Sequence, residues 1–191
     1  MTGQQTHYFY ALELPGEIKE IMKGTIHSLQ GELPFKTWVH PQDLHITLAF
    51  LGNAPEEKIK AANERIEAAI NKTTTFKLEI NHLGIFGRKD APRIFWAGLE
   101  KSTELNEVRE AVFSSCTSAG FTLETRPFSP HITLSRKWAG EEAFTTDQLE
   151  VLNPIKKEFT FHAERVVLYK THLGKSPKYE PIILFPLASR S

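Results

Sequence analysis

The tetrapeptide His-Ile-Thr-Leu occurs twice in this chain of 191 residues, at residues 45–48 and again at residues 131–134. The two copies are 86 residues apart (131 − 45 = 86). Similar patterns of strands and helices surround each copy, so the sequence predicts an internal duplication over approximately residues 7–86 and 93–170. A chain of this kind is expected to fold into two related units that bring their equivalent strands together.

Each half is expected to run strand, helix, strand, helix, strand. In the first half these elements are predicted at residues 7–14, 16–30, 37–52, 55–71 and 76–86. In the second half they are predicted at residues 93–100, 105–119, 131–136, 145–152 and 159–169, followed by a last strand at 179–188. This order predicts an α+β fold in which residues 1–191 form a single bilobal domain. Its two lobes of antiparallel sheet plus helices are expected to be related by a pseudo-two-fold axis around a central cleft.

The residues on these strands align at two different shifts. Tyr10 and Ala11 shifted by 86 positions fall on Trp96 and Ala97. The later strands align at a shift of 83 positions, which places Phe76 on Phe159 and Phe86 on Tyr169. The difference of three is expected in a connecting loop, where changes in length are tolerated.

Composition narrows the class of protein. Lys and Arg total 23, as do Asp and Glu, so the formal net charge is zero, which argues against a strong non-specific polyanion binder but leaves room for a local basic cleft. One cysteine, Cys116, excludes a disulfide within the chain and favours a reducing cytoplasm. No secretory signal pattern and no apolar run of roughly 18 residues is present, so we expect a cytoplasmic monomer with no membrane contact.

The repeated tetrapeptide carries the candidate chemistry. Residues i and i+2 of a strand point to one face, so His45 shares a face with Thr47, and His131 with Thr133. Histidine titrates near neutral pH, so one imidazole can act as a base while the other acts as an acid. Displacement at phosphorus places the attacking and leaving oxygens in line, which suits two imidazoles facing one phosphate. The threonine hydroxyls can hydrogen-bond the non-bridging oxygens.

Other interpretations of the same residues stay open at this point. Catalytic zinc generally needs three protein ligands, and the two motifs supply two histidines, with Asp43 as the nearest carboxylate. Cys116 lies on the apolar stripe of a predicted helix, which is typical of a core thiol and not of a nucleophile. A third interpretation is that both copies only retain a favourable strand sequence, although strand packing alone does not require histidine at either position.

The segments around the motifs resemble the two-histidine (2H) phosphoesterase superfamily. They are YALELP near the start, LHITLAFLG, FSPHITLSR and VVLYKTHLGKSPKYEPI near the end. Within that superfamily they are most similar to the bacterial RNA 2′,3′-cyclic phosphodiesterases, the 2′-5′ RNA ligase or LigT-like proteins. The resemblance implies hydrolysis of a 2′,3′-cyclic phosphate at an RNA end, or of a small cyclic-phosphate nucleotide, to a 2′-phosphomonoester. It also implies no metal or cofactor, and 2′-5′ joining as a possible side activity.

The resemblance also implies roles for individual residues. His45 would donate a proton to the 3′ oxygen, His131 would activate water, and Arg136 would contact phosphate. Arg136 lies five residues after His131, so strict alternation points it away from the cleft unless the strand contains a bulge. Phe50 occupies the position equivalent to Arg136 in the first half, and Phe50 and Tyr169 are expected at the rim of the cleft.

Several other residues are weaker candidates for the site, and two other functions are possible for it. The basic loop 86–93 can touch an RNA backbone, and Lys170 and His172 follow Tyr169 toward the rim. The remaining histidines have no paired context and are expected to be structural or on the surface: His7, His27, His40, His82 and His162. A non-catalytic module that binds RNA ends is the first rival. A 2H enzyme for another cyclic phosphate or a 2′-5′ linked oligonucleotide is the second.

Overall fold

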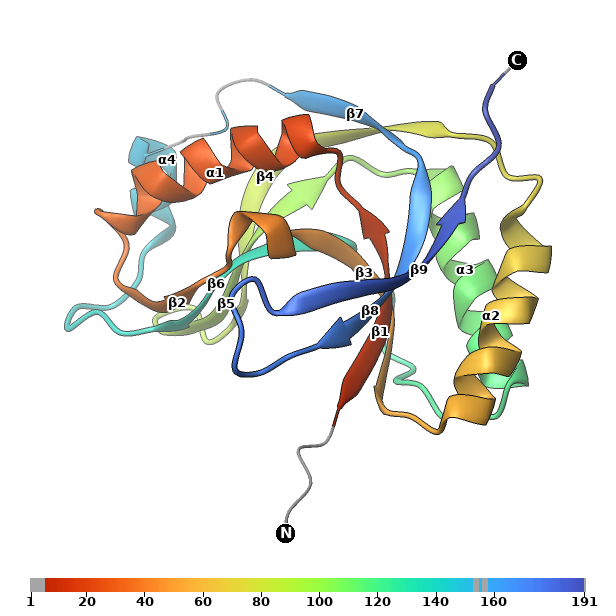
Figure 1. Ribbon diagram of the computed structural model, residues 1–191. Helices are drawn as coiled ribbons and strands as arrows, with labels where there is room; N and C mark the ends of the chain where they lie inside the picture. Colours follow the sequence, from red (N-terminus) through yellow and green to blue (C-terminus); the bar gives the residue numbers. More distant parts are fainter. Residues whose placement is uncertain (1–5, 153–154, 156–157, 191) are drawn as a thin grey trace, which may run out of the picture.

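A computed structural model describes residues 6–152, 155 and 158–190 of the chain (Figure 1). Its helices are α1 (Gly16–Gln30), the short 3-10 helix η1 (Pro41–Asp43), α2 (Glu56–Ile70), α3 (Thr103–Ser118) and α4 (Thr146–Leu152). Its strands are β1 (His7–Glu13), β2 (Phe35–Trp38), β3 (His45–Asn53), β4 (Phe76–Gly87), β5 (Pro92–Leu99), β6 (His131–Trp138), β7 (Phe159–Ala163), β8 (Arg165–Thr171) and β9 (Tyr179–Pro186). The alternation of strands and helices expected from the sequence is therefore present.

The strands form two antiparallel sheets that do not follow the two halves of the chain. The first sheet has the order β3-β1-β8-β9 and the second has the order β2-β6-β5-β4-β7. Strand β8, from the second half, pairs with β1. Strand β4, from the first half, pairs with β5. The two halves of the chain thus exchange their last strands, and each motif strand lies in a sheet completed by the other half.

The strand register confirms one of the predicted shifts and corrects the other. In the first sheet Ala11 is opposite Thr47, and in the second sheet Trp96 is opposite Thr133. Ala11 therefore corresponds to Trp96, a shift of 85 (96 − 11 = 85) and not 86. This difference matters because a shift of one residue moves every side chain to the other face of a strand. The predicted shift of 83 is confirmed for Phe86 and Tyr169, since Tyr169 pairs with Phe9 as Phe86 pairs with Ile94. It is wrong for Phe76 and Phe159, because both lie in the second sheet and equivalent residues lie in different sheets.

Two predicted strands are interrupted. The strand expected over residues 159–169 is wrong as one element, because it divides at Glu164 into β7, in the second sheet, and β8, in the first. The extended segment 37–52 is broken by η1, which begins at Pro41. The fixed φ of proline suits the first position of a helical turn, so the chain bends there before β3 begins at His45.

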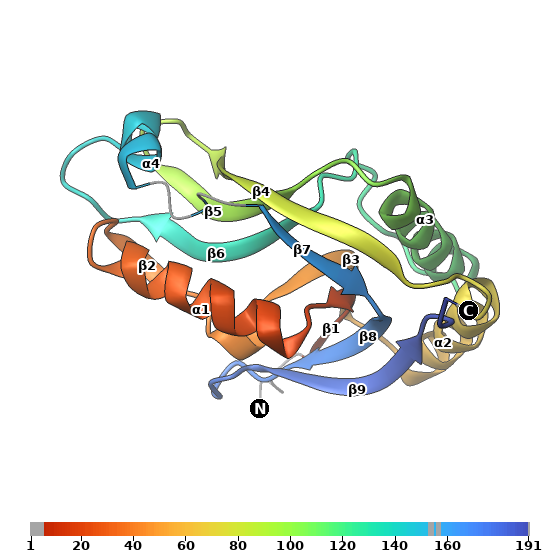
Figure 2. The same cartoon turned by 90° about the horizontal axis from the view of Figure 1, so that it is seen from above.

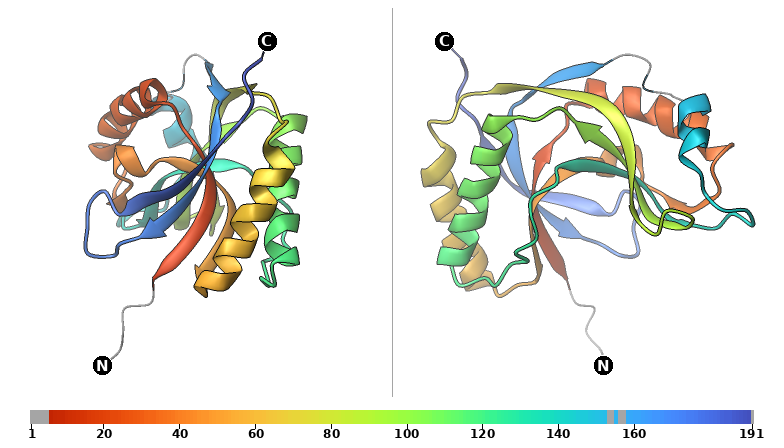
Figure 3. Two further views of the ribbon diagram at one scale, coloured as in Figure 1. Left: turned by 45° about the vertical axis from the view of Figure 1, so that its right-hand side comes forward. Right: turned by 180° about the vertical axis from the view of Figure 1, so that it is seen from behind.

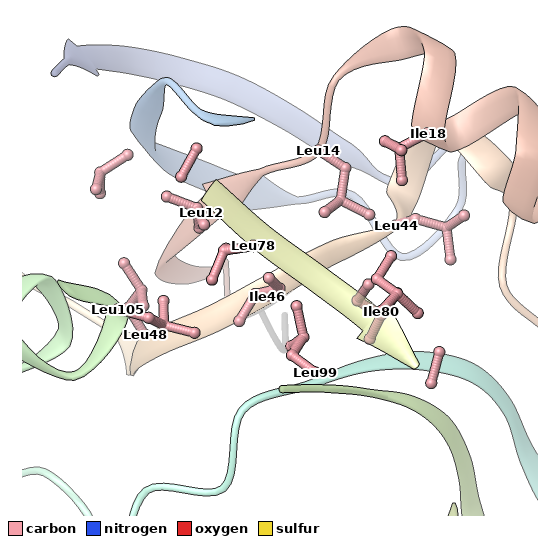
Figure 4. Packing of buried hydrophobic residues seen from close by; sticks show 14 of the residues in the cluster. Leu12, Leu14, Ile18, Leu44, Ile46, Leu48, Leu78, Ile80, Leu99 and Leu105 are labelled. Carbon is pink, nitrogen blue, oxygen red and sulfur yellow. The ribbon is translucent and has the colours of Figure 1, made fainter. Parts of the chain in front are cut away.

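One apolar core joins both sheets to the helices. Alternate residues of the strands are buried, such as Leu12 and Ile46 in the first sheet and Leu78 and Leu99 in the second. Figure 4 shows these side chains in one cluster, and each contributes about 1.5–3 kcal/mol to stability when fully buried. Helices α2 and α3 lie side by side against one flank, and α1 covers the opposite flank (Figures 2 and 3).

The single cysteine of the chain, Cys116, lies on α3. Cys116 is fully buried in the apolar cluster, as predicted from its place on the helical stripe, and burial raises the pKa of its thiol to about 12. None of the helices in the described part of the chain is long and apolar enough to cross a membrane.

Candidate active site

The two motif histidines have the same local geometry. His45 Nδ1 lies 2.7 Å from the backbone oxygen of Asp43, and His131 Nδ1 lies 2.7 Å from the backbone oxygen of Ser129. A carbonyl oxygen only accepts, so Nδ1 carries the hydrogen in both rings. Nε2 is then the nitrogen that takes or gives a proton in each case. The two motifs therefore share a tautomer as well as a residue type.

The threonine of the first motif contacts its histidine directly. Thr47 Oγ1 lies 2.9 Å from His45 Nε2. Because Nδ1 of the neutral ring donates to Asp43, Nε2 has a free lone pair and the Thr47 hydroxyl donates to it. This contact confirms that the side chains of His45 and Thr47 lie on one face of β3, while Ile46 and Leu48 are buried on the other.

A bulge in each motif strand redirects the residues that follow the threonine. In β6, Ser135 pairs with Phe95 and Thr133 with Trp96, so Leu134 is left over as a bulge. Leu134 and Ser135 are both buried, and Arg136 is then half-buried on the face of His131 and Thr133. This is the bulge that the sequence required if Arg136 was to face the cleft.

The same bulge occurs in β3. Ala49 pairs with Tyr10 and Thr47 with Ala11, which leaves Leu48 unpaired. Phe50 then comes to the face of His45, and 57% of its surface is exposed. Phe50 contacts the ring of His7 edge-on at a centroid distance of 5.8 Å. Phe50 and Arg136 therefore occupy equivalent positions in the two sheets and present an aromatic ring and a cation respectively.

Aromatic rings surround His45 in the first sheet. The centroid of the Phe9 ring is 4.8 Å from that of His45, and the ring of Tyr179 is 5.3 Å away. Tyr169 stacks on Phe9 at 5.3 Å and lies 6.1 Å from His45. Only 5% of Tyr169 is exposed, so this residue forms the floor beneath His45 and not an outer rim.

His131 has an aromatic wall of its own. Phe86 meets its ring edge-on at 4.9 Å, and Trp96 lies 6.2 Å away. Phe86 is equivalent to Tyr169 by the confirmed shift, but Trp96 replaces the alanine of the first sheet. Reasoning from the sequence missed the rings of Phe9, Phe86, Trp96 and Tyr179. The corrected strand register is the signal that would have found Trp96.

Burial and neighbouring charges favour the neutral form of both imidazoles. Burial, with smaller contributions from the charges of His131 and Arg136, lowers the pKa of His45 to about 4. Burial first, and then the charge of Arg136, also lower the pKa of His131. Arg136 and the two histidines therefore act on one another, in agreement with the contact between β3 and β6. A bound anion would oppose these effects and favour protonation.

Asp43 supports the first histidine and does not serve as a free ligand. Its carboxylate is buried and accepts hydrogen bonds from the backbone N–H groups of Lys178 at 2.9 Å and Tyr179 at 3.1 Å. It thereby ties the start of β9 to the turn that holds His45. Within residues 6–152, 155 and 158–190, no three His, Cys, Asp or Glu side chains gather closely enough to hold a metal ion.

The weaker candidates lie outside this cluster or are engaged elsewhere. In the basic loop, Arg88 binds Asp90 through two hydrogen bonds of 3.0 and 2.6 Å, which reduces its free charge. His172 binds the carboxylate of Glu180. His82 packs edge-on against Trp96 at 5.5 Å, and His162 is exposed on β7.

The sequence of this chain matches a known protein family. Residues 18–175 match the family model of the 2′-5′ RNA ligase superfamily. The chain belongs to this superfamily. A relative from Geobacillus stearothermophilus, named RNA 2′,3′-cyclic phosphodiesterase, is 44% identical over 96% of this chain. The chain spans only 58% of the length of that relative. A Bacillus subtilis relative of the same name is 35% identical over 98% of this chain and 100% of its own length.

Solved structures of the superfamily show the same fold. E. coli LigT complexed with 3′-AMP superimposes with a TM-score of 0.76 at 24% identity, covering 95% of this chain and 98% of that chain. A protein from Thermus thermophilus superimposes with a TM-score of 0.76 at 23% identity, covering 97% and 100% of the two chains. The predicted α+β fold of the 2H phosphoesterases is thus confirmed.

Proposed function

We propose that this protein is an RNA 2′,3′-cyclic phosphodiesterase that opens a cyclic phosphate at an RNA end to a 2′-phosphomonoester. The relatives that bear this name support the substrate class. The observation that carries the chemistry is the matched pair of imidazoles, each with its Nδ1 hydrogen held by a backbone carbonyl two residues earlier. An in-line displacement needs one base and one acid, and this pair supplies both.

In the proposed reaction, Nε2 of His131 takes a proton from water while the water oxygen attacks phosphorus. The bond between phosphorus and O3′ breaks, and protonated His45 gives its proton to O3′. Thr47, Thr133 and Arg136 hold the non-bridging oxygens, whose charge grows in the transition state. Exchange of protons with solvent then restores the starting states of the two rings. If the 5′-hydroxyl of another RNA replaces water, the same steps join a 2′-5′ linkage.

The first test replaces each histidine. We expect His45→Ala and His131→Ala each to lower kcat for a 2′,3′-cyclic mononucleotide by about 10²–10⁴-fold, the usual contribution of one general acid or base. His162→Ala is the matched control, because His162 is exposed on β7 away from the motifs. A chelator is expected to leave the rate unchanged. Activity that survives in the double variant would exclude the mechanism.

A second test separates the donor from the base. An aryl phosphodiester has a leaving group that departs without a proton, so the donor is needed less than the base. We therefore expect His45→Ala to retain a larger fraction of wild-type activity on the aryl ester than on the cyclic phosphate. His131→Ala is expected to lose activity equally on both. The opposite pattern would exchange the two roles.

Two rival functions are distinguished by turnover. A non-catalytic module would bind a cyclic mononucleotide without releasing a 2′-phosphomonoester. An enzyme for another cyclic phosphate would turn over a different member of a small substrate panel faster. We also propose a location in the cytoplasm, on the basis of the single buried cysteine, which fractionation of cells tests. The protein is further proposed to be a monomer, which light scattering tests.

A further inference from the structure

A groove with a volume of about 760 Å³ opens beside the histidine pair. It is bounded by α1, by the segment from β2 to η1, and by the turn between β8 and β9. Figure 1 shows α1 above this region and the β8–β9 turn below it. Arg136 is one of the residues that line it, and the proposed reaction uses no other side chain of the groove.

The groove is more cationic than the chain as a whole. The cations that line it are Lys23, Arg136, Lys175 and Lys178. Two carboxylates, those of Glu20 and Asp43, also line it. Asp43 already accepts two backbone hydrogen bonds, and Glu20 makes only a loose pair with Lys23 at 3.8 Å between exposed side chains. An excess of positive charge is therefore available here in a chain whose net charge is zero.

Arg136 connects the groove to the histidine pair. Its charge lowers the pKa values of His45 and His131, and its side chain also lines the groove. A strand that leaves a phosphate held by Arg136 can therefore continue into the groove. At the equivalent position of the first sheet stands Phe50, so the two ends of the symmetric site differ in chemistry (136 − 50 = 86). One end offers a ring and the other a cationic path.

We propose that this groove binds the phosphodiester backbone of the nucleotides on the 5′ side of the cyclic end. The inference rests on the proposed function and adds a preference for an oligonucleotide terminus over a cyclic mononucleotide. Lys23 and Lys175 contact successive phosphates from opposite walls of the groove. Trp38, half-buried in the wall, presents a ring on which a base stacks.

The test compares two substrates that carry the same cyclic end. One is uridine 2′,3′-cyclic phosphate, and the other is a pentanucleotide that ends in the same group. In the double variant Lys23→Ala/Lys175→Ala, we expect kcat/KM for the pentanucleotide to fall at least tenfold, mainly through KM. The value for the mononucleotide is expected to stay within twofold. Lys60→Ala/Lys72→Ala is the matched control, because these lysines are exposed and lie outside the groove.

Salt dependence gives a second measurement. Loss of two contacts to a single strand lowers the slope of log(kcat/KM) against log[salt] by about 1.4, since each contact contributes roughly 0.7. Between 50 and 200 mM salt, that difference corresponds to about a sevenfold change. We expect it for the pentanucleotide and not for the mononucleotide.

The outcomes separate the groove from the proposed function. If wild-type protein turns over the mononucleotide but the double variant treats both substrates as wild type does, the groove inference is wrong and the function stands. If the variant loses activity equally on both substrates, the two lysines act at the catalytic centre and the groove inference is also wrong. If neither substrate is turned over, the function is wrong. Binding of the pentanucleotide, measured by fluorescence anisotropy, then decides the groove alone, and unchanged affinity in the variant overturns it.

Discussion

The low pKa of His45 predicts an unusual pH dependence. Burial lowers the pKa of His45 to about 4, and it also brings the pKa of His131 below its ordinary value of 6.5. The proposed reaction needs His45 protonated and His131 neutral. In the free enzyme this form is most abundant midway between the two pKa values, and therefore below about pH 5.3, since (4 + 6.5)/2 is an upper bound. Two unperturbed imidazoles would place the maximum near pH 6.5.

Binding of the substrate is expected to raise the pKa of His45 in the complex. At pH 7, a group with a pKa of about 4 is protonated in only about 10⁻³ of molecules, which corresponds to about 4 kcal/mol. A phosphate anion about 4 Å from the ring supplies about 4 kcal/mol at the effective dielectric constant of a protein surface. Binding of the cyclic phosphate is therefore sufficient to raise the pKa of His45 to about 7, and binding near pH 7 is expected to take up about half a proton.

Steady-state kinetics test both parts of this prediction. Rates with uridine 2′,3′-cyclic phosphate from pH 4 to pH 9 at constant ionic strength give kcat/KM, which reports the free enzyme, and kcat, which reports the complex. We expect the basic limb of kcat/KM below pH 6.5 and that of kcat at higher pH. Arg136→Gln removes a charge that lowers both pKa values, so both limbs of kcat/KM should move upward. A basic limb of kcat/KM at pH 7 or above, or identical profiles for the two constants, would refute the reasoning.

Three further substitutions probe the framework of the site. Ser135→Ala should stabilise the fold by about 1 kcal/mol in urea unfolding, because its buried hydroxyl has no hydrogen-bond partner among the residues that the structure describes, and the equivalent residue is Ala49. A loss of stability would contradict this. Asp43→Asn should lower the free energy of unfolding by about 1–3 kcal/mol, because an amide oxygen cannot accept both backbone N–H groups. It should also move the acid limb of kcat/KM to lower pH, because it removes a negative charge that raises the pKa of His45. Gly84→Ala would place a methyl group 2.3 Å from the Trp96 ring, so we expect about 1–3 kcal/mol of destabilisation and altered tryptophan fluorescence, and an unchanged unfolding midpoint would show that the ring moves freely.

Local patterns accounted for most of what the sequence predicted correctly. The helices α1 and α2 follow from apolar residues at helical spacing and begin directly after Pro15 and Pro55. The faces of His45 and Thr47 follow from the alternation of a strand. Arg136 required a bulge, and the strand contains one. Each of these features is determined within a few residues, so one sequence is sufficient to predict it.

Features that depend on pairing between distant strands were not predictable in this way. The exchange of β4 and β8 between the sheets changes no local pattern, because each strand buries some apolar side chains, such as Leu78 in β4 and Val166 in β8, whichever partner it has. The alignment of Ala11 with Ala97 matched identical residues but placed them on opposite faces. Only the pairing of Ala11 with Thr47 and of Trp96 with Thr133 establishes the correct register.

That register shows how a duplicated fold acquires an asymmetric site. In the first sheet Ala11 is opposite Val167, and at the equivalent position of the second sheet Trp96 is opposite Gly84. The larger residue of the pair is Val167 on β8 in the first sheet and Trp96 on β5 in the second. An indole therefore lies beside His131, where the first sheet has an alanine beside the motif strand. Phe50 and Arg136 are also equivalent in position, each after the bulge of its motif strand, but one is an aromatic ring and the other a cation. The histidines and their backbone acceptors are equivalent in the two sheets, as the proposed proton transfers require. The surrounding positions differ, which suits the unsymmetric RNA end of the proposed function, and we infer that they determine which oxygen of the cyclic phosphate faces the donor.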